Sequence, residues 1–247
     1  MSEHTLAFIG GGNMARSLIG GLVARGRAAA SIHVAEPQES LRQALAADFG
    51  VQVHATASEA ARDAGTWVLS VKPQVMRAVC TELAPLAAGA NPLVVSIAAG
   101  VTTAQMDEWL GGGQAVVRTM PNTPSLLGAG ATGLYANPRV TDAGRELAGA
   151  LMSAVGLAAW IPDEAQMDAV TAVSGSGPAY VFLLAEAMQA AGVAQGLAPD
   201  TARDLANQTL LGAARMLVET GEDAATLRKR VTSPGGTTQA AIESFEA

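Results

Sequence analysis

The chain has little from which to build disulfides or a histidine-based site. Its 247 residues include one cysteine, Cys80, and three histidines, His4, His33 and His54. A single cysteine allows no disulfide within the chain, so we expect a reducing, cytoplasmic compartment and a buried thiol in the apolar helix around Cys80. We expect no metal site and no histidine general acid, because these residues are few and all three histidines precede residue 55.

Positive charge and long apolar runs are also scarce. The 15 Lys and Arg residues are outnumbered by 22 Asp and Glu residues, which gives a formal net charge of −7. This balance argues against nucleic acid or an anionic membrane surface as the main partner. No apolar run approaches about 18 residues. The run Leu6–Ile9 ends in glycines, so we expect a strand there and no signal peptide.

Short apolar runs alternate with helical patterns up to about residue 162. Helices are expected at about 38–49, 74–87, 103–110 and 141–154. The expected strands are Leu6–Ile9, Ser31–Ala35, Val51–Val53, Trp67–Val71, Leu93–Ile97, Ala115–Arg118, Ala131–Tyr135 and Ala158–Ile161. This alternation predicts a doubly wound, mostly parallel sheet in an α/β domain over residues 1–162.

From Asp163 onward the pattern is helical, and residues 163–247 predict a second, all-α domain. One of its helices is expected to begin with Asp200 as N-cap and to reach about residue 219. A helical region of this size has difficulty burying its apolar faces alone. A dimer built from these helices, or shielding by the first domain, would solve that problem.

One stretch has the spacing of a nucleotide-binding loop. The strand Leu6–Ile9 runs into Gly10-x-Gly12-x-x-Ala15, the dinucleotide fingerprint in its G-x-G-x-x-A form. Gly10 permits a tight turn, Gly12 lets a pyrophosphate approach the backbone, and Ala15 lets the helix pack closely on the strand. The glycines could also form a turn and nothing more. Their place between a strand and a helix favours a nucleotide facing the helix N-terminus.

Other candidate residues follow the later strands, where ligands of open α/β sheets bind. Glu36 is placed either to hold a ribose 2′-hydroxyl, which favours NAD over NADP, or to be a solvated loop acid. Lys72 is one of two lysines in the chain, and it is placed to contact cofactor ribose or phosphate. The remaining segments at this edge are Ala98-Ala99-Gly100 and Met120–Pro124.

Two polar, glycine-rich stretches occur after residue 162. Ser174-Gly175-Ser176-Gly177-Pro178 interrupts a helical pattern, and Thr232–Thr238 precedes one. The first is either a helix break, with Pro178 at the first position of the next helix, or a place where two serines meet a small polar ligand. The second is either a loop between helices or a carboxylate cradle of hydroxyls and free N–H groups.

Six motifs together resemble one family. In order, they are Phe8-Ile-Gly-Gly-Gly-Asn-Met14, Val71-Lys-Pro-Gln74, Val95-Ser-Ile-Ala-Ala-Gly100, Met120-Pro-Asn-Thr-Pro124, Val173-Ser-Gly-Ser-Gly-Pro-Ala-Tyr180 and Ser233-Pro-Gly-Gly-Thr-Thr238. The set resembles the pyrroline-5-carboxylate reductases, which catalyse the last step of proline synthesis, from about residue 5 to the end. The last two motifs are far more specific than the dinucleotide fingerprint.

The resemblance implies a Rossmann domain followed by a helical domain that interlocks as a homodimer, often within larger rings of dimers. It implies reduction of 1-pyrroline-5-carboxylate to L-proline with NADPH or NADH. The expected cofactor contacts are Ile9, Gly10, Gly11, Gly12, Asn13, Met14, Glu36, Pro37, Val71, Lys72, Pro73, Ala98, Ala99, Asn122 and Arg230. The expected substrate contacts are Glu164, Ser174, Ser176, Ser233, Gly235, Gly236, Thr237 and Thr238. Thr238 is also the expected catalytic residue, bonded to the substrate's ring nitrogen, in a pocket drawn from both subunits.

Three positions depart from the family pattern. Many relatives carry Ser, Thr or Arg in place of Glu36, and an asparagine that often helps to hold the adenine-side phosphate is matched by Ala57. Conversely, Arg230 could supply a phosphate partner from the second subunit. These residues leave the choice between NADPH and NADH open. Relatives also usually continue through another helix beyond the position of Ala247.

Two rival functions share much of this pattern. A β-hydroxyacid dehydrogenase relies on a lysine in its second domain, where this chain has only Lys229, without a matching motif. A cofactor-binding sensor would show no turnover and would tolerate loss of the Thr237 and Thr238 hydroxyls. The reductase agrees best with the scarcity of histidine, because a protonated cyclic imine is already electrophilic and mainly needs positioning.

Overall fold

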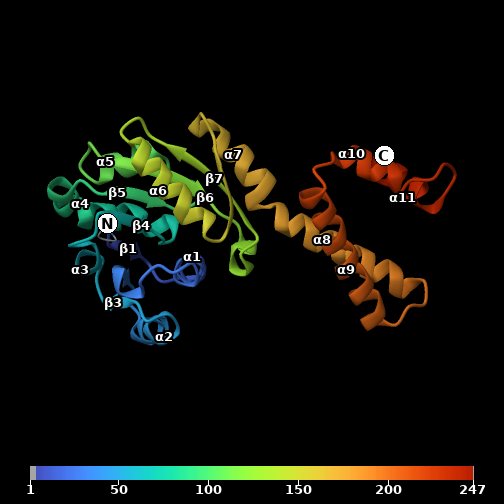
Figure 1. The fold of residues 1–247 in the computed structure, drawn as a ribbon, viewed down its shortest axis with the longest axis horizontal. Coiled ribbons are helices and arrows are strands. Elements are labelled where there is room, and N and C mark those ends of the chain that lie inside the picture. The colour runs from blue at the N-terminus through green and yellow to red at the C-terminus, as the bar shows by residue number, and fades with distance from the viewer. Residues whose placement is uncertain (1–3, 247) are drawn as a thin grey trace. The chain divides into compact units, whose positions relative to one another are not determined.

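The computed structural model describes residues 4–246, so residues 1–3 and 247, at the ends of the predicted domain ranges, lie outside it. The strands are β1 (Leu6–Ile9), β2 (Ile32–Ala35), β3 (Gln52–His54), β4 (Thr66–Leu69), β5 (Leu93–Ser96), β6 (Ala115–Met120), β7 (Gly130–Ala136) and β8 (Gly156–Trp160) (Figure 1). The α-helices are α1 (Asn13–Ala24), α2 (Glu39–Phe49), α3 (Ala57–Ala61), α4 (Pro73–Ala90), α5 (Thr103–Trp109), α6 (Asp142–Ser153), α7 (Met167–Val170), α8 (Gly177–Ala194), α9 (Pro199–Glu219), α10 (Ala224–Arg230) and α11 (Thr237–Glu246).

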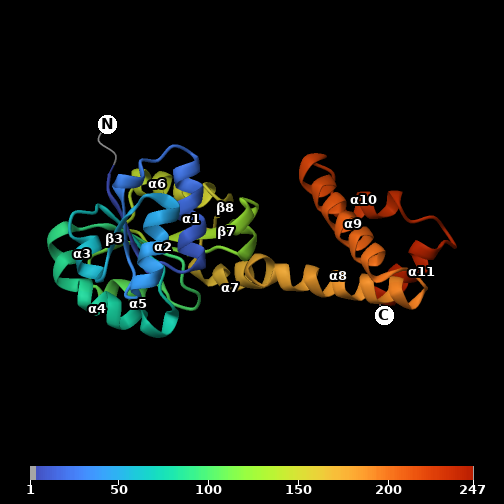
Figure 2. The same cartoon turned by 90° about the horizontal axis from the view of Figure 1, so that it is seen from below.

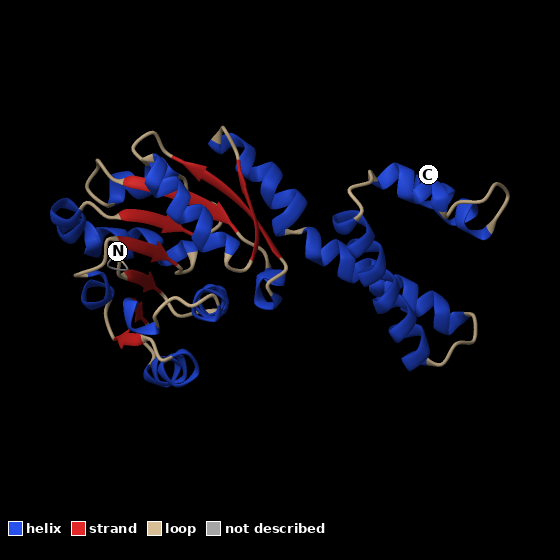
Figure 3. Ribbon diagram, in the orientation of Figure 1, coloured by secondary structure: helices blue, strands red, loops and turns tan. Residues whose placement is uncertain are grey.

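The chain forms two compact units, Met1–Pro178 and Ala179–Ala247, which we call the first and second unit. All the strands of the described chain belong to the first unit, and the described part of the second unit contains only helices and loops (Figure 3). These observations confirm the predicted fold class. The predicted domain boundary at residue 162 stays a prediction; residues 164–177 pack within the first unit.

The eight strands form one sheet in the order β3-β2-β1-β4-β5-β6-β7-β8. Neighbouring strands from β3 to β6 run parallel, β7 is antiparallel to β6, and β8 is parallel to β7. The sheet is therefore mostly parallel, as predicted, and every predicted strand is present.

Helices cover both faces of the sheet, which explains why its central strands are continuous apolar runs. In β1, Leu6 and Phe8 join a buried cluster with side chains of α1, α2 and α6, whereas Ala7 and Ile9 join a cluster with side chains of α3, α4 and α5. Figure 2 shows the first unit from below, with these helices around the sheet. Because period-2 alternation puts successive residues into different clusters, both faces require apolar side chains.

Three local predictions differ from the structure. Helix α3 was not expected, because five residues are too few to show a helical period; it begins with a capping box formed by Thr56 and Glu59. The N-cap of α9 is Ala198 and not Asp200, since Pro199 occupies the first helical turn, where its missing N–H costs nothing.

The third difference concerns the expected helix break at Ser174–Pro178. A π-helical turn (Thr171–Gly175) follows α7 directly, a bend at Ser176 separates this turn from α8, and Pro178 is the second residue of α8 instead of the first. The Ser176 N–H donates to the Thr171 carbonyl at 2.8 Å, the i to i−5 bond that defines such a turn. π-Turns of this kind often occur at functional sites.

The thiol of Cys80 is buried in the cluster between α4 and the sheet, as predicted. Burial raises the pKa of Cys80 to about 11. We therefore predict that a disulfide reagent at pH 8 modifies the native thiol at least about 100-fold more slowly than the unfolded one, because the thiolate is the reactive species. Rapid, stoichiometric modification of the folded protein in a thiol titration would contradict this placement.

Candidate active site

The carboxyl ends of four parallel strands lie side by side at one edge of the sheet. The register pairs Ile9 of β1 with Ala35 of β2 and Leu69 of β4, and it pairs Leu69 with Ser96 of β5. The predicted cofactor segments that follow these strand ends are Gly10–Met14, Glu36–Pro37, Val71–Pro73 and Ala98–Ala99. The fold thus brings together segments that the sequence could only propose separately, at the edge where such sheets bind ligands.

Gly10 makes the sharp turn after β1 and has no room for a side chain. Its φ is +107°, and a Cβ there would lie 2.7 Å from the carbonyl oxygen of Ser70. The Ser70 hydroxyl donates to the Gly10 carbonyl at 2.7 Å, and the Gly10 N–H donates to the Ala35 carbonyl at 2.9 Å. The start of the loop is therefore fixed by β2 and by the residue after β4.

Gly12 differs from Gly10, because open space surrounds it. It is the N-cap of α1 with an ordinary φ of −69°, it has no side-chain cap, and a Cβ there would meet nothing within 4 Å. The first N–H groups of α1 are thus left without a side-chain partner beside a cradle that a side chain would fill. A helix N-terminus of this kind binds phosphate, so the loop fits the pyrophosphate of a dinucleotide.

Glu36 lies against this loop. Its Oε2 accepts a hydrogen bond from the Gly11 N–H at 3.2 Å, and its Oε1 accepts one from the Gln38 N–H at 3.0 Å. The guanidinium of Arg42 donates to the carbonyls of Glu36 at 2.8 Å and Pro37 at 2.6 Å. Two backbone N–H groups therefore hold the carboxylate and Arg42 holds the backbone of Glu36, so this residue is not a freely solvated loop acid.

The segments after β4 and β5 are less constrained. Lys72 is the exposed N-cap of α4, with Pro73 as the first helical residue, and its ammonium forms no ion pair within residues 4–246. Ala98 is buried and its N–H donates to the Ser96 hydroxyl at 3.2 Å, whereas Ala99 is exposed. Val71 lies beside Gly10, with Cγ1 3.2 Å from the position of a Cβ there.

Asn122 joins three segments of the first unit. Its Nδ2 donates to the Ser174 carbonyl at 2.9 Å, and its Oδ1 accepts from the Ala131 N–H at 2.9 Å. A Cβ on Gly175 would lie 2.7 Å from the Met120 methyl, so the π-turn packs closely on the loop after β6. The Ser174 hydroxyl donates to the Val170 carbonyl at 2.9 Å.

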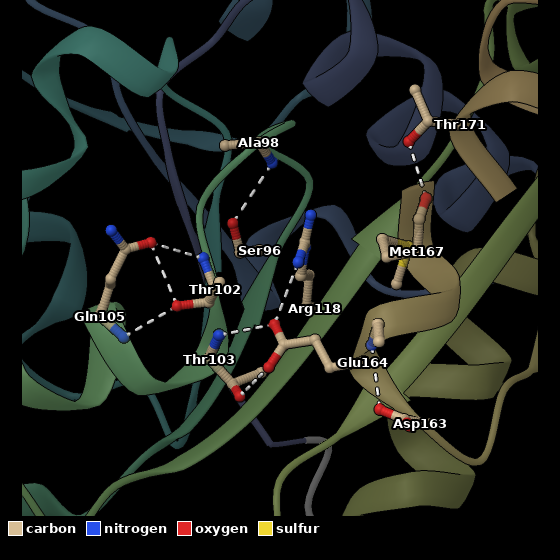
Figure 4. Close-up of polar contacts among 11 residues, drawn as sticks. Ser96, Ala98, Thr102, Thr103, Gln105, Arg118, Asp163, Glu164, Met167 and Thr171 are labelled. Atoms are coloured by element: carbon tan, nitrogen blue, oxygen red, sulfur yellow. Dashed lines mark hydrogen bonds and ion pairs between the residues drawn. The ribbon is translucent and has the colours of Figure 1, made fainter. Parts of the chain in front are cut away.

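Glu164 is the centre of a polar cluster in the first unit (Figure 4). Its Oε1 accepts from the Thr103 N–H at 2.8 Å and from Arg118 Nη1 at 3.2 Å, and its Oε2 accepts from the Thr103 hydroxyl at 2.8 Å. The side chain of Arg118 is 8% exposed and that of Glu164 is 20% exposed. A carboxylate has about four acceptor positions, so this one has about one left for a ligand.

The Ser233–Thr238 loop belongs to the second unit. Gly235 has a φ of +69°, its N–H donates to Gln239 Oε1 at 2.8 Å, and the Gly236 N–H donates to the Ser233 carbonyl at 3.0 Å. Thr237 and Thr238 are exposed at the start of α11, and within the described chain neither hydroxyl has a partner. Their hydroxyls are thus available to a ligand.

The remaining predicted cofactor contact, Arg230, has a partner in its own unit. Its guanidinium binds the Glu222 carboxylate through two contacts of 2.7 and 2.6 Å. This exposed pair is worth little energy and would not prevent another anion from binding.

Two histidines of the first unit contact each other on β2 and β3, and the His54 carbonyl also accepts a hydrogen bond from the Glu36 N–H at 3.0 Å. His33 and His54 stack on neighbouring strands with ring centroids 5.0 Å apart. Burial, together with the charge of His54, lowers the pKa of His33. Among the described residues, no group of three or more His, Cys, Asp and Glu side chains could hold a metal ion.

Sequence reasoning missed several residues that shape the site: Ser70, Arg42, Thr103 and Arg118. An arginine inside the apolar strand β6 was a usable signal, because a buried arginine requires an anionic partner. The other three carry no such signal: Ser70 and Thr103 bind groups about 60 residues away in the sequence, and Arg42 binds only backbone carbonyls.

Comparison with known proteins assigns both parts of the chain. Residues 164–247 match the family model described as pyrroline-5-carboxylate reductase dimerisation. Residues 5–100 match the model described as NADP oxidoreductase, coenzyme F420-dependent.

Full-length relatives agree with these matches. The chain is 56% identical to a pyrroline-5-carboxylate reductase from Pseudomonas aeruginosa over 247 residues, which cover all of this chain and 90% of that protein. The solved pyrroline-5-carboxylate reductase from Coxiella burnetii is 44% identical, with a TM-score of 0.93 over 98% of this chain and 90% of that one. The Plasmodium falciparum pyrroline carboxylate reductase, solved with NADP bound, is 28% identical, with a TM-score of 0.86 over 100% of this chain and 90% of that one.

Proposed function

The chain belongs to the pyrroline-5-carboxylate reductase family, and from this premise we propose which of its residues hold the two reactants. It is an NAD(P)H-dependent oxidoreductase that acts on a C=N bond, reducing 1-pyrroline-5-carboxylate to L-proline in proline biosynthesis. The full-length match at 56% identity carries this conclusion. The open cradle at Gly12 supports it from the structure.

We propose that the first unit holds the dinucleotide at the strand edge described above. The backbone of Gly10–Met14 binds the pyrophosphate at the N-terminus of α1, while Glu36–Pro37, Val71–Pro73, Ala98–Ala99 and Asn122 lie along its length. Asn122 contributes through its backbone, because its side-chain amide is already bonded on both atoms. The bound cofactor supplies the hydride.

The substrate half of the proposal uses the exposed hydroxyls of the second unit. Thr238 donates or accepts a hydrogen bond at the ring nitrogen, and Ser233 and Thr237 hold the carboxylate through their hydroxyl groups. Gly235 and Gly236, whose N–H groups already donate to Gln239 and Ser233, shape the loop around the carboxylate. In the first unit, the proposed substrate contacts are Glu164, through its remaining acceptor position, and Ser174 and Ser176. The imine carbon gains the hydride and the nitrogen keeps its proton, so these residues need only orient and stabilise the charged nitrogen.

The surface of α8 supports a homodimer. No residue of this helix is buried, although it carries Tyr180, Val181, Phe182, Leu183 and Leu184 in succession. A helix that is apolar all round is stable only when it is covered. We propose that a second copy of the chain covers it, that the pocket takes residues from both copies, and that dimers can assemble further into rings.

The proposed location is the cytoplasm, in keeping with the single reduced cysteine. Among residues 4–246, the structure contains no helix that is both long and apolar enough to span a membrane. The acidic net charge of −7 favours neither nucleic acid nor an anionic membrane as partner.

We predict that Thr238→Val lowers kcat/KM for 1-pyrroline-5-carboxylate by about 10- to 100-fold, because a hydrogen bond to a charged group contributes about 1.5–3 kcal/mol. Affinity for NADH or NADPH, measured by fluorescence titration, should not change. Thr232→Val is the matched control, because its hydroxyl already donates to the Arg228 carbonyl at 2.7 Å. Equal turnover by both variants would refute the role of Thr238.

Cofactor binding without turnover by the wild-type dimer would instead support the sensor hypothesis. Turnover of a β-hydroxy acid, lost in Lys229→Ala, would support the dehydrogenase. The spectrophotometric assay with NADH and NADPH in parallel separates these functions.

A further inference from the structure

Glu36 directly follows β2, the position from which an acidic residue contacts the adenosine ribose in such folds, and the 2′ group of this ribose is where NADH and NADPH differ. Its two carboxylate oxygens accept the Gly11 and Gln38 N–H groups at 3.2 and 3.0 Å, which holds the partly buried side chain against the second glycine of the loop. We propose that Glu36 makes this reductase select NADH over NADPH. This inference rests on the proposed function and specifies its cofactor.

The chemistry of the two cofactors gives the reason. NADH has a hydroxyl at the 2′ position of its adenosine ribose, and an acid after the second strand of such a fold accepts a hydrogen bond from that hydroxyl. The Glu36 carboxylate has about two acceptor positions left after its two backbone bonds. A 2′-phosphate brings further negative charge and no hydroxyl proton to the same place, so the carboxylate repels it.

Among residues 4–246, no arginine forms an ion pair with the Glu36 carboxylate. Arg42 is the nearest candidate, but its guanidinium donates to the Glu36 and Pro37 carbonyls and not to the carboxylate. Arg16 pairs with Asp48. Its guanidinium also lies over the ring of Phe49, 5.1 Å from the centroid.

Arg230, the phosphate partner that the sequence suggested, pairs with Glu222 in its own unit. Within the described chain, every arginine named as a possible phosphate partner is therefore already bonded elsewhere. The exposed Arg230–Glu222 pair is weak, so the expected preference for NADH depends on the uncompensated charge of Glu36 in the first unit.

The test compares Glu36→Gln with the wild type in two measurements. The first is the dissociation constant of NADH and of NADPH without substrate, by fluorescence titration; the second is kcat/KM for each cofactor with 1-pyrroline-5-carboxylate. We expect the wild type to favour NADH by at least about tenfold in both, because each tenfold needs only about 1.4 kcal/mol. Glutamine keeps an oxygen for the Gly11 N–H, so Glu36→Gln preserves the loop and removes only the charge. The preference for NADH should then fall at least about tenfold, mainly because NADPH binds more tightly.

Glu39→Gln is the matched control, because it removes the same charge three residues away. Glu39 is exposed in the first turn of α2, where its carboxylate accepts from Gln43 at 3.2 Å. The cofactor preference of the Glu39→Gln variant should stay within about twofold of the wild-type preference.

A wild-type preference for NADPH, or an unchanged preference in Glu36→Gln, would overturn the proposal. The binding measurement separates this failure from a failure of the proposed function. If neither cofactor is oxidised with 1-pyrroline-5-carboxylate, the reductase assignment fails, while a selective affinity for NADH that Glu36→Gln removes would still support the role of Glu36.

Discussion

Gly12→Ala should weaken the binding of NADH and NADPH by at least about 100-fold while changing the free energy of unfolding by less than about 1 kcal/mol. In the protein without cofactor, a Cβ at this position meets nothing within 4 Å and the φ of −69° suits alanine. The methyl group would instead occupy the space that a pyrophosphate needs, and hydrogen bonds to a charged group, each worth about 1.5–3 kcal/mol, would be lost.

Gly10→Ala is the matched comparison in the same loop, because there the methyl group collides with the protein itself. The left-handed φ of +107° and the Ser70 carbonyl oxygen at 2.7 Å leave no room for a Cβ. We expect this variant to lose about 3–4 kcal/mol of stability from strain and overpacking, in addition to its cofactor affinity.

Urea denaturation and fluorescence titration of both variants would measure these two quantities. The prediction fails if Gly12→Ala binds the cofactors as the wild type does. It also fails if Gly12→Ala is as unstable as Gly10→Ala, because the loop would then be a structural turn and not a cradle.

Glu164→Ala should destabilise the protein by about 3 kcal/mol, because it leaves the buried Arg118 guanidinium without its carboxylate. Arg118 is 8% exposed, and the Thr103 N–H and hydroxyl lose the same partner. For a chain of this length, the melting temperature should fall by roughly 6–12 °C.

The double variant Arg118→Met/Glu164→Met is the control for this prediction. Removing both charges leaves no unpaired ion, so it should recover most of the lost stability although the ion pair is absent. If Glu164→Ala unfolds at the wild-type temperature, the cluster does not hold the segment after β8 to α5. If Glu164 also binds substrate, as we propose, the folded double variant should still show a raised KM.

Much of the fold could be predicted from local sequence, because each strand or helix depends mainly on residues that are close together in the chain. Four apolar residues followed by glycines indicate a buried parallel strand whichever protein contains them, and each predicted strand is found within one or two residues of its place. The five-residue helix α3 was missed because its capping box, Thr56 with Glu59, was not followed by a helical period. The π-turn was missed because glycines usually end a helix, whereas here Gly175 allows close packing on Met120.

Part of the proposed site could be derived from the sequence for the same reason. Motifs such as Gly10–Met14 and Ser233–Thr238 are contiguous, so the turns and free N–H groups that they form can be predicted from the sequence. The bond between Gly11 and Glu36 joins residues 25 apart, and the bond between Thr103 and Glu164 joins residues 61 apart. No spacing rule covers such pairs, since they meet only through the register of the sheet and the packing of helices on it.

The sequence by itself therefore determined the strand order along the chain, the glycine-rich turn between β1 and α1, the helical character of the second unit and the family. Each of these depends on residues that are neighbours in sequence or on a pattern repeated within one segment. The tertiary structure alone decided that Glu36 is held by the loop, that Gly10 and Gly12 differ in their surroundings, and that Glu164 neutralises Arg118. These features depend on distances between segments, which are fixed only when the strands pair and the helices pack against them.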